Sequence, residues 1–320
     1  MLAAILALVV GTWNGNWFPS GRAEHRAHPE VEAATIAAAG KMLSDGLAAA
    51  DPSGAEGVVI VLNEIRNREV AEALAAIIGR PGLKLASISA YRRRDRFDQQ
   101  QDAILTTLPV ADSGWGRWQR GRESNPPRGY AFAAVVVSPA VTAQVYAVHL
   151  KSNYGATTKA LADENRAKRT DAIDQFIALA KGAPRVVLAG DFNADKWRGE
   201  FAAETIFSSL DAAGYANLIS LMPPNGRGTH PNRRYGDSAL DYIMAKGMTA
   251  VGAPSLVPNA GLSDHFAVFA RLEPAPVAAV RGGVSAAPVS SQRRSSPKPR
   301  RKGRRPAGSR DSQRAPSRTP

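Results

Sequence analysis

The sequence contains no cysteine, which excludes disulfide frameworks, thiolate metal sites and cysteine nucleophiles. It also has no apolar run that approaches the roughly 20 residues of a transmembrane helix, so we predict no integral membrane segment. Aromatic residues make up only 7% of the 320 residues, but 44% are hydrophobic, which is enough for a sizeable core. The length fits one large globular domain or two small ones.

Acidic residues are scarce at the C-terminal end. Residues 281–320 contain 12 Lys and Arg but one acid, Asp311, so they carry +11 of the chain's net charge of +13 and leave +2 for residues 1–280. Large apolar side chains are almost absent after Val289, and such a segment cannot bury enough surface to offset its chain entropy. We therefore predict a globular domain over residues 1–275 and a disordered, basic Ser/Pro/Arg-rich tail over 276–320. The tail would attract polyanions without sequence preference, but a solubilising extension with no dedicated partner has the same composition.

The apolar residues 1–10 resemble the core of a signal peptide. They lack a positively charged start, and they run directly into Gly11-Thr12-Trp13-Asn14 without a clear cleavage site. This favours a buried first strand. A true start upstream of Met1 would permit secretion or periplasmic export, so the sequence leaves the compartment open.

Apolar β-rich runs alternate with segments of helical periodicity. The runs typical of buried strands are residues 58–62, 131–137, 145–150, 185–190, 240–244 and 266–269. Helical patterns cover residues 30–50, 68–78 and 161–181. Many strands with a few helices between them predict an α/β fold in which a two-layer sheet core is flanked by helices.

Polar side chains of three chemical types lie at or near the ends of these strands. They are the carboxylates, carboxamides and imidazoles of Asn14, Glu64, His149, Asp191, Asn193, Asp241, Asp264 and His265. One such residue is usually only solvated, but eight are hard to attribute to coincidence. If the strand ends converge, they form a pocket with oxygen ligands for a hard divalent cation and two imidazoles. Such a pocket suits phosphodiester hydrolysis, because carboxylate-held Mg²⁺ or Mn²⁺ neutralises the phosphate and a His–carboxylate pair moves the proton.

Six short segments resemble, in order, the signature motifs of the endonuclease/exonuclease/phosphatase superfamily, which includes the pancreatic deoxyribonuclease-like phosphoesterases. They are Trp13-Asn14, Asn63-Glu64-Ile65, Val148-His149-Leu150-Lys151-Ser152, Gly190-Asp191-Phe192-Asn193, Leu240-Asp241-Tyr242-Ile243 and Ser263-Asp264-His265. Each motif alone is weak, but the ordered set spans residues 12–272. The resemblance implies a four-layer α/β sandwich of two packed mixed β-sheets flanked by helices, and a divalent-metal-dependent phosphoesterase.

The resemblance also implies a metal site and a proton-transfer pair. Glu64 would be the main ligand of Mg²⁺ or Mn²⁺, supported by Asn14 and by Asp264 directly or through water. His265, oriented by Asp241, would be the general base or the protonated partner of the phosphate.

Three further catalytic roles follow from the same resemblance. Asp191 would position or activate the nucleophilic water, and Asn193 would hold the phosphate. His149 would stabilise the phosphoryl oxygen or the leaving group. A histidine at this position looks more like the deoxyribonuclease and sphingomyelinase branches than the repair-nuclease branch.

Basic side chains near the motifs are candidates for binding a polyanionic substrate. Lys151 is the best placed, because it follows the predicted strand of His149, and Arg128 is a second candidate, with Arg233 and Arg234 further along the chain. The segment 115–122 mixes Trp and Arg in an expected loop, which suits base stacking and phosphate contact but equally a surface loop held by its tryptophans.

Other polar residues have weaker support. We expect His25, His28 and His230 to be solvated loop residues rather than metal ligands. One of Gln100, Gln101 and Asp102 could orient His149 through a hydrogen bond.

The sequence thus favours a nuclease. The alternative within the same fold is a phospholipid or inositol-phosphate phosphoesterase, although no long aromatic–apolar hairpin of the membrane-inserting kind is present. A non-catalytic polyanion-binding protein is disfavoured, because every expected catalytic position holds a competent residue. We expect a monomer, and the choice between DNA and RNA and between endo- and exonucleolytic action stays open.

Overall fold

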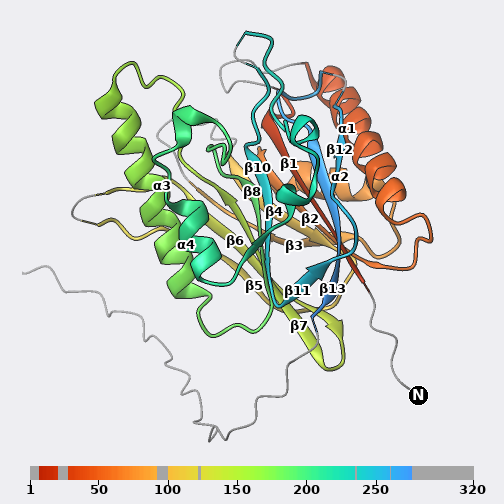
Figure 1. Ribbon diagram of the computed structural model, residues 1–320. Helices are drawn as coiled ribbons and strands as arrows, with labels where there is room; N and C mark the ends of the chain where they lie inside the picture. The colour runs from red at the N-terminus through yellow and green to blue at the C-terminus, as the bar shows by residue number, and fades with distance from the viewer. Residues whose placement is uncertain are drawn as a thin grey trace, which may run out of the picture. The chain divides into compact units, whose positions relative to one another are not determined.

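Two mixed β-sheets pack face to face, and helices cover their outer faces, in the computed structural model (Figure 1). The structure describes residues 7–20, 28–91, 100–121, 124–234, 236–259 and 261–275. This arrangement confirms the predicted four-layer α/β sandwich. The predicted basic tail, residues 276–320, lies outside the described residues.

The first sheet has the strand order β11-β13-β1-β2-β4-β3, and β12 also pairs with β13. At its centre β1 and β2 run parallel, whereas the other neighbouring strands are antiparallel. The strands are β1 (Leu8–Phe18), β2 (Gly57–Ile65), β3 (Lys84–Ile88), β4 (Gln101–Thr106), β11 (Met248–Ala250), β12 (Ser255–Val257) and β13 (Ala267–Pro274).

The second sheet has the order β5-β6-β7-β8-β10-β9, and its parallel pair is β7 and β8. Its other pairings are antiparallel. The strands are β5 (Val110–Arg117), β6 (Gly129–Ser138), β7 (Val141–His149), β8 (Val186–Asp191), β9 (Ala216–Asn217) and β10 (Asp241–Lys246).

Helices α1 (Pro29–Ala50) and α2 (Arg68–Ile78) lie on one side of the sandwich, and α3 (Lys159–Leu179) and α4 (Ile206–Ala212) lie on the other (Figure 1). The parallel pairs arise because α1 connects β1 to β2 and α3 connects β7 to β8, as crossover connections do. Local signals fix the ends of α2: the Asn67 side chain accepts from the Val70 N–H at 3.1 Å, and Gly79 ends the helix with φ 68°. Short 3₁₀ turns span Gly199–Phe201, Leu218–Leu221 and Pro224–Gly226. None of the helices in the described ranges is both long and apolar enough to cross a membrane.

Side-chain alternation along the central strands divides the apolar core. Val9 and Val58 belong to a cluster that packs against α1 and α2, whereas their neighbours Val10 and Val59 belong to the cluster shared with the second sheet and α3. The two faces of a strand are one residue apart, so strands buried on both faces read as continuous apolar runs. This pattern is what makes these strands predictable.

Most predicted elements are confirmed, and one is wrong. The three predicted helices correspond to α1, α2 and α3 with ends within two residues, and residues 8–10 are the buried start of β1. The sequence predicts a loop over 115–122, but Trp115 lies on the edge strand β5 and Trp118 is buried, with its ring 5.2 Å from that of Tyr130. The alternation of apolar and polar residues along β5 is weak, because the residues of this edge strand are exposed or only partly buried. His28 is exposed before α1, as expected, and His25 lies outside the described residues.

A buried ion pair holds the segment after β7 in place. The side chains of Arg169 on α3 and Glu204 before α4 are only 1% and 4% exposed, and they form an ion pair. Arg169 Nη1 also donates to the Lys151 carbonyl at 2.7 Å and to Asn153 Oδ1 at 3.1 Å. One guanidinium thus joins the helical layer to the loop that follows His149.

We predict that Glu204→Ala lowers the free energy of unfolding by about 3–5 kcal/mol, because it leaves the Arg169 charge buried without its partner. Urea denaturation measures the change. Asp45→Ala is the control, since its pair with Lys41 is 63–74% exposed and should contribute less than about 1 kcal/mol. Equal effects of the two substitutions would contradict the assignment.

Candidate active site

The sheets bring the predicted polar residues to one end of the sandwich. In the second sheet His149, Asp191 and Asp241 are register partners on three adjacent strands, β7, β8 and β10. In the first sheet Asn14 on β1 is opposite Asn63 on β2. Both parallel pairs therefore end at the same end of the sandwich. In α/β folds, ligands bind at the carboxyl ends of parallel strands.

Asn14 joins two buried carboxylates from the two sheets. Its Nδ2 donates to Asp191 Oδ2 at 2.9 Å and to Glu64 Oε1 at 3.3 Å. The second oxygen of Glu64 accepts from the Trp17 N–H at 3.1 Å. The Asn14 oxygen accepts from the Asn16 N–H at 2.9 Å, and an amide oxygen has a second lone pair with which to bind a cation.

The carboxylates of Glu64 and Asp191 suit a hard divalent cation, both as oxygen ligands and by their charge. Burial raises the pKa of Glu64, and burial raises that of Asp191 to about 7, with the neighbouring carboxylates adding to the shift. A divalent cation between them would compensate this unfavourable charge, and carboxylate and amide oxygens are the ligands that Mg²⁺ and Mn²⁺ prefer. Glu64, Asn14 and Asp191 therefore fit the predicted metal.

A second buried layer positions Asp191. The Asn63 side-chain oxygen accepts from the Asp191 backbone N–H at 3.1 Å, and its Nδ2 donates to Asp102 Oδ1 at 2.7 Å. Tyr91 donates its hydroxyl to the other Asp102 oxygen at 3.1 Å. Burial raises the pKa of Asp102 to about 7. Asp102 thus acts on Asn63, and not on His149 as one of the sequence-based alternatives predicts.

His265 and Asp241 form a close pair. His265 Nδ1 lies 2.7 Å from Asp241 Oδ2, and the opposite ring nitrogen, Nε2, lies 4.0 Å from Asp191 Oδ2. Burial by itself lowers the pKa of His265, but the carboxylates of Asp241, Asp191 and Asp264 raise it to about 10. The imidazole is therefore charged near neutral pH, and its Nε2 proton points toward the carboxylate cluster.

His149 has the opposite charge state. It is 3% exposed, and burial, together with the Arg128 charge, lowers its pKa well below 6.5. Its Nε2 lies 3.6 Å from both Glu64 Oε1 and Asp191 Oδ2, while its Nδ1 has no hydrogen-bond partner among the described residues. The site therefore combines one neutral and one charged imidazole.

The remaining predicted residues border this cluster. Asn193 donates from Nδ2 to Asp191 Oδ2 at 2.9 Å and to the Leu150 carbonyl at 3.2 Å. Arg128 donates to the carbonyls of His149 and Leu150 at 2.9 and 2.6 Å, so its guanidinium supports the end of β7. Lys151 is partly exposed, and its ammonium donates to the Ser152 carbonyl at 2.7 Å.

The backbone is strained around the site. The non-glycine residues with positive φ in the described ranges are Asn16, Trp17, Glu64, Arg128 and Asn193, at 50–64°. All five lie in or beside the cluster, and such strain is typical of functional sites. Gly190 has φ 136°, and a Cβ there would lie 2.0 Å from the Val148 carbonyl oxygen, so glycine allows β8 to approach β7 immediately before Asp191.

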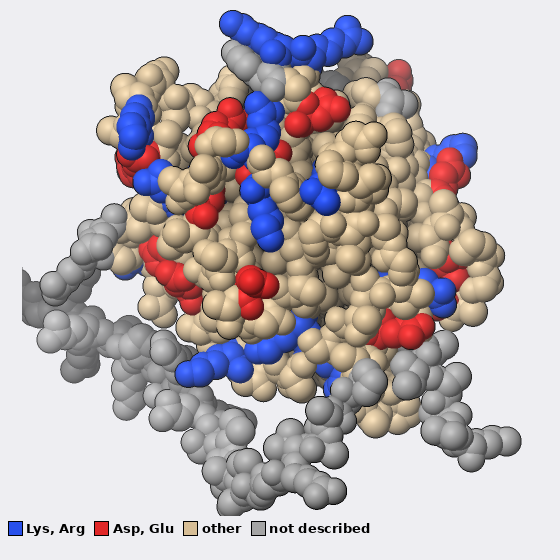
Figure 2. All heavy atoms as spheres, viewed as in Figure 1, with Lys and Arg blue, Asp and Glu red and all other residues tan. Residues whose placement is uncertain are grey.

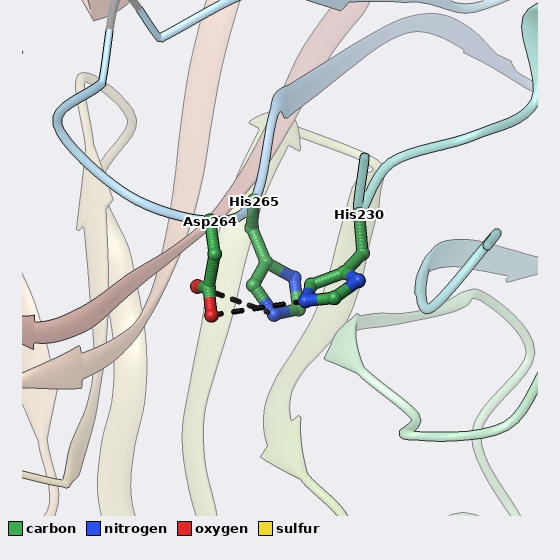
Figure 3. Close-up of side chains that lie close together, drawn as sticks. All are labelled: His230, Asp264 and His265. Atoms are coloured by element: carbon green, nitrogen blue, oxygen red, sulfur yellow. Dashed lines mark ion pairs between the residues drawn. The ribbon is translucent and has the colours of Figure 1, made fainter. Parts of the chain in front are cut away.

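Asp264 faces two imidazoles. Its Oδ1 lies 3.8 Å from His265 Nε2, and its Oδ2 lies 3.7 Å from His230 Nε2 (Figure 3). Burial raises the pKa of Asp264, but the two imidazoles lower it more. His230, expected to be a solvated loop residue, is only 22% exposed in its side chain.

Sequence reasoning assigned no role to Asn63, expected Asp102 to act on His149 if at all, and expected His230 to be solvated. Asn63 lies near the end of a fully buried strand, and a buried carboxamide requires partners, so a signal was present. Asp102 similarly precedes the apolar run 103–105. No local sequence pattern indicates that His230 belongs to the cluster, because the residues that it contacts, Asp264 and His265, lie far along the chain, just before β13.

Comparisons with known proteins agree with this geometry. A sequence profile of the endonuclease/exonuclease/phosphatase family matches residues 11–265. The comparison with curated protein sequences gives no match.

Solved structures share the fold at low sequence identity. The endonuclease/exonuclease/phosphatase from Beutenbergia cavernae DSM 12333 has a TM-score of 0.57 and 16% identity, covering 84% of this chain and 72% of that chain. A family protein from Leptotrichia buccalis C-1013-b has a TM-score of 0.59 and 13% identity, covering 83% and 100%. D. rerio TDP2 complexed with single strand DNA product has a TM-score of 0.55 and 16% identity, covering 83% and 99%.

The profile match spans most of the chain and includes all six motifs that converge in the structure. The chain therefore belongs to the endonuclease/exonuclease/phosphatase family, whose members are hydrolases of phosphoester bonds.

Proposed function

We propose that this protein is a divalent-metal-dependent phosphodiesterase that cleaves nucleic acid. The observation that carries the proposal is the position of the His265–Asp241 pair beside the buried oxygen cluster: His265 Nε2 lies 4.0 Å from Asp191 Oδ2, and Asn14 links Asp191 to Glu64. Metal-dependent phosphodiester hydrolysis uses a cation and a proton donor close together, and oxygen ligands beside a histidine suit both needs.

Glu64 and Asn14 would hold Mg²⁺ or Mn²⁺, with Asp191 as the nearest further oxygen donor. Asp264 would reach the cation through water, since its carboxylate faces His265 and His230. The cation, when bound, neutralises phosphate charge and lowers the pKa of bound water.

The charge state of His265 and the position of Asp191 indicate which group donates a proton and which accepts one. His265, with a pKa of about 10, is the protonated partner that donates from Nε2 to a phosphoryl oxygen, and Asp241 holds its ring from the other side. Asp191, whose Oδ2 lies 4.0 Å from His265 Nε2, would accept a proton from the attacking water or position it. Neutral His149 and the amide of Asn193 complete the set of groups that contact the phosphate.

Positive charge near the mouth of the site favours a polyanionic substrate. Figure 2 shows Lys and Arg side chains at the upper end of the molecule, where Figure 1 places the loop that leads to β10. Arg233 and Arg234 on this loop are exposed, and Lys151 follows His149. The similarity in fold to TDP2 complexed with single strand DNA product supports the same substrate class.

We predict metal-dependent nicking of supercoiled plasmid by the purified protein with Mg²⁺ or Mn²⁺. EDTA should abolish it, and His265→Ala and Glu64→Gln should each lower the rate by about 10²–10⁴-fold while the circular dichroism spectrum stays unchanged. Near-normal activity in either variant would overturn the assigned roles. Intact plasmid with all metals tested would refute the nuclease and direct the assay to phospholipid and inositol-phosphate substrates.

The pH dependence distinguishes the two roles open to His265. A raised pKa means that the charged form persists to about pH 10 and is lost above it. Asp241→Asn removes the largest contribution that raises this pKa, so the alkaline limb of the kcat/KM profile should move toward the ordinary value of about 6.5. If His265 acted as a neutral base, the acid limb would move to lower pH instead.

The basic tail gives a separate prediction about affinity. We propose that residues 298–305, which contain six Lys and Arg, contact phosphates without sequence preference. Replacing those six with Gln in the full chain should flatten the plot of log affinity for single-stranded DNA against log salt, by about 0.7 for each phosphate that is no longer neutralised. Fluorescence anisotropy in EDTA measures binding without cleavage. An unchanged slope would identify the tail as a solubilising extension.

A further inference from the structure

A compact donor cluster, formed by His230, Asp264 and His265, lies beside the oxygen cluster but differs from it in chemistry (Figure 3). One ligand atom of each residue lies within 4.8 Å of the others. His230 comes from the loop before β10, and the other two precede β13. The Phe266 N–H donates to the Thr229 carbonyl at 2.7 Å, so main-chain bonding sets the two segments side by side.

The separations fit shared coordination of one ion. His230 Nε2 is 3.7 Å from Asp264 Oδ2, and His265 Nε2 is 3.8 Å from Asp264 Oδ1. Two ligands of a tetrahedral zinc ion lie about 3.4 Å apart, given bonds of about 2.1 Å. The two distances go to different oxygens of Asp264, so one ion would be held by both carboxylate oxygens or after a rotation of the Asp264 side chain.

The orientation of His265 is already set for coordination. Its Nδ1 lies 2.7 Å from Asp241 Oδ2, and its backbone N–H donates to Ser263 Oγ at 3.0 Å. A carboxylate behind one ring nitrogen is the usual support of a metal-binding imidazole, because it fixes the ring and makes the other nitrogen a better ligand. Nε2 is therefore directed into the cluster.

The donor set selects a different class of cation from the Asn14–Glu64 cluster. Two imidazole nitrogens and one carboxylate suit borderline cations such as Zn²⁺, whereas Mg²⁺ prefers oxygen ligands alone. The Asp264 side chain is 49% exposed, so an ion can enter from solvent. Three protein ligands leave one coordination position open, as in other accessible zinc sites.

We propose that His230, Asp264 and His265 form a binding site for Zn²⁺, and that its occupancy inhibits the enzyme. Coordination takes up His265 Nε2, and the proton on that nitrogen passes to solvent. The same atom is then unable to donate to a phosphoryl oxygen. This second part rests on the proposed function, whereas the binding site itself does not.

Metal binding to the full chain tests the site without reference to turnover. Co²⁺ and Zn²⁺ are titrated in excess Mg²⁺, with the visible absorption of Co²⁺ and the heat of Zn²⁺ binding as readouts. His230→Gln should weaken binding by at least about tenfold, the scale set by the loss of metal-site support. His28→Gln makes the same chemical change at an exposed position and should bind as the wild type does.

Wild-type affinity and an unchanged Co²⁺ spectrum in His230→Gln would overturn the site. His230→Asn is the second variant, and thermal melts verify that each variant folds. No metal binding by the wild-type chain would also overturn it.

Inhibition is measured separately, in the plasmid assay with excess Mg²⁺. Zn²⁺ should inhibit the wild type and His28→Gln equally, and His230→Gln should retain Mg²⁺-dependent cleavage but need at least about tenfold more Zn²⁺ for the same inhibition. Equal sensitivity of all three proteins would overturn the inhibitory role. If no protein cleaves plasmid, the proposed nuclease fails, and the Co²⁺ titration still decides the metal site.

Discussion

The buried carboxylate of Asp191 is the constraint on which the site depends. It accepts from Asn14 in the other sheet and from Asn193 in its own segment, and it lies within 4.0 Å of the Nε2 atoms of both His149 and His265. A carboxylate buried in this way is costly unless it is compensated, and its pKa rises to about 7 in consequence. The electrostatic cost of burying this charge favours the binding of a cation beside it.

The surrounding fold maintains this costly arrangement. Asn63 fixes the Asp191 backbone, and Asp102 holds Asn63 from behind, while Glu64 and Asn193 keep strained positive φ angles. Strain of this kind persists only where packing determines the conformation. Two apolar clusters, one on each face of β1 and β2, supply that packing, so the polar site depends on the sandwich core.

The two adjacent clusters differ in their ligand atoms and therefore in the cation that they suit. The oxygen atoms around Asn14 and Glu64 suit a hard cation, and the imidazoles of His230 and His265 suit a borderline one. His265 borders both clusters, through Asp191 on one side and Asp264 on the other. The proposed zinc site would therefore use the same imidazole, His265, that donates a proton in the proposed reaction. The metal present in solution would then affect the reaction.

The sequence by itself determined the buried strands β1, β2, β6, β7, β8, β10 and β13, the three long helices and the family, because buried strands produce continuous apolar runs and because ordered motifs are local. It did not predict β3, β4, β5, β9, β11 or β12. It also predicted that Glu64, Asp191, Asp241 and His265 belong to one site. Only the tertiary structure decided how they meet: which charge state His265 takes, that Asp264 turns toward His230, and that Asp102 acts through Asn63. These outcomes depend on distances between side chains from different sheets and on their burial, and neither quantity is encoded in any local stretch of the chain.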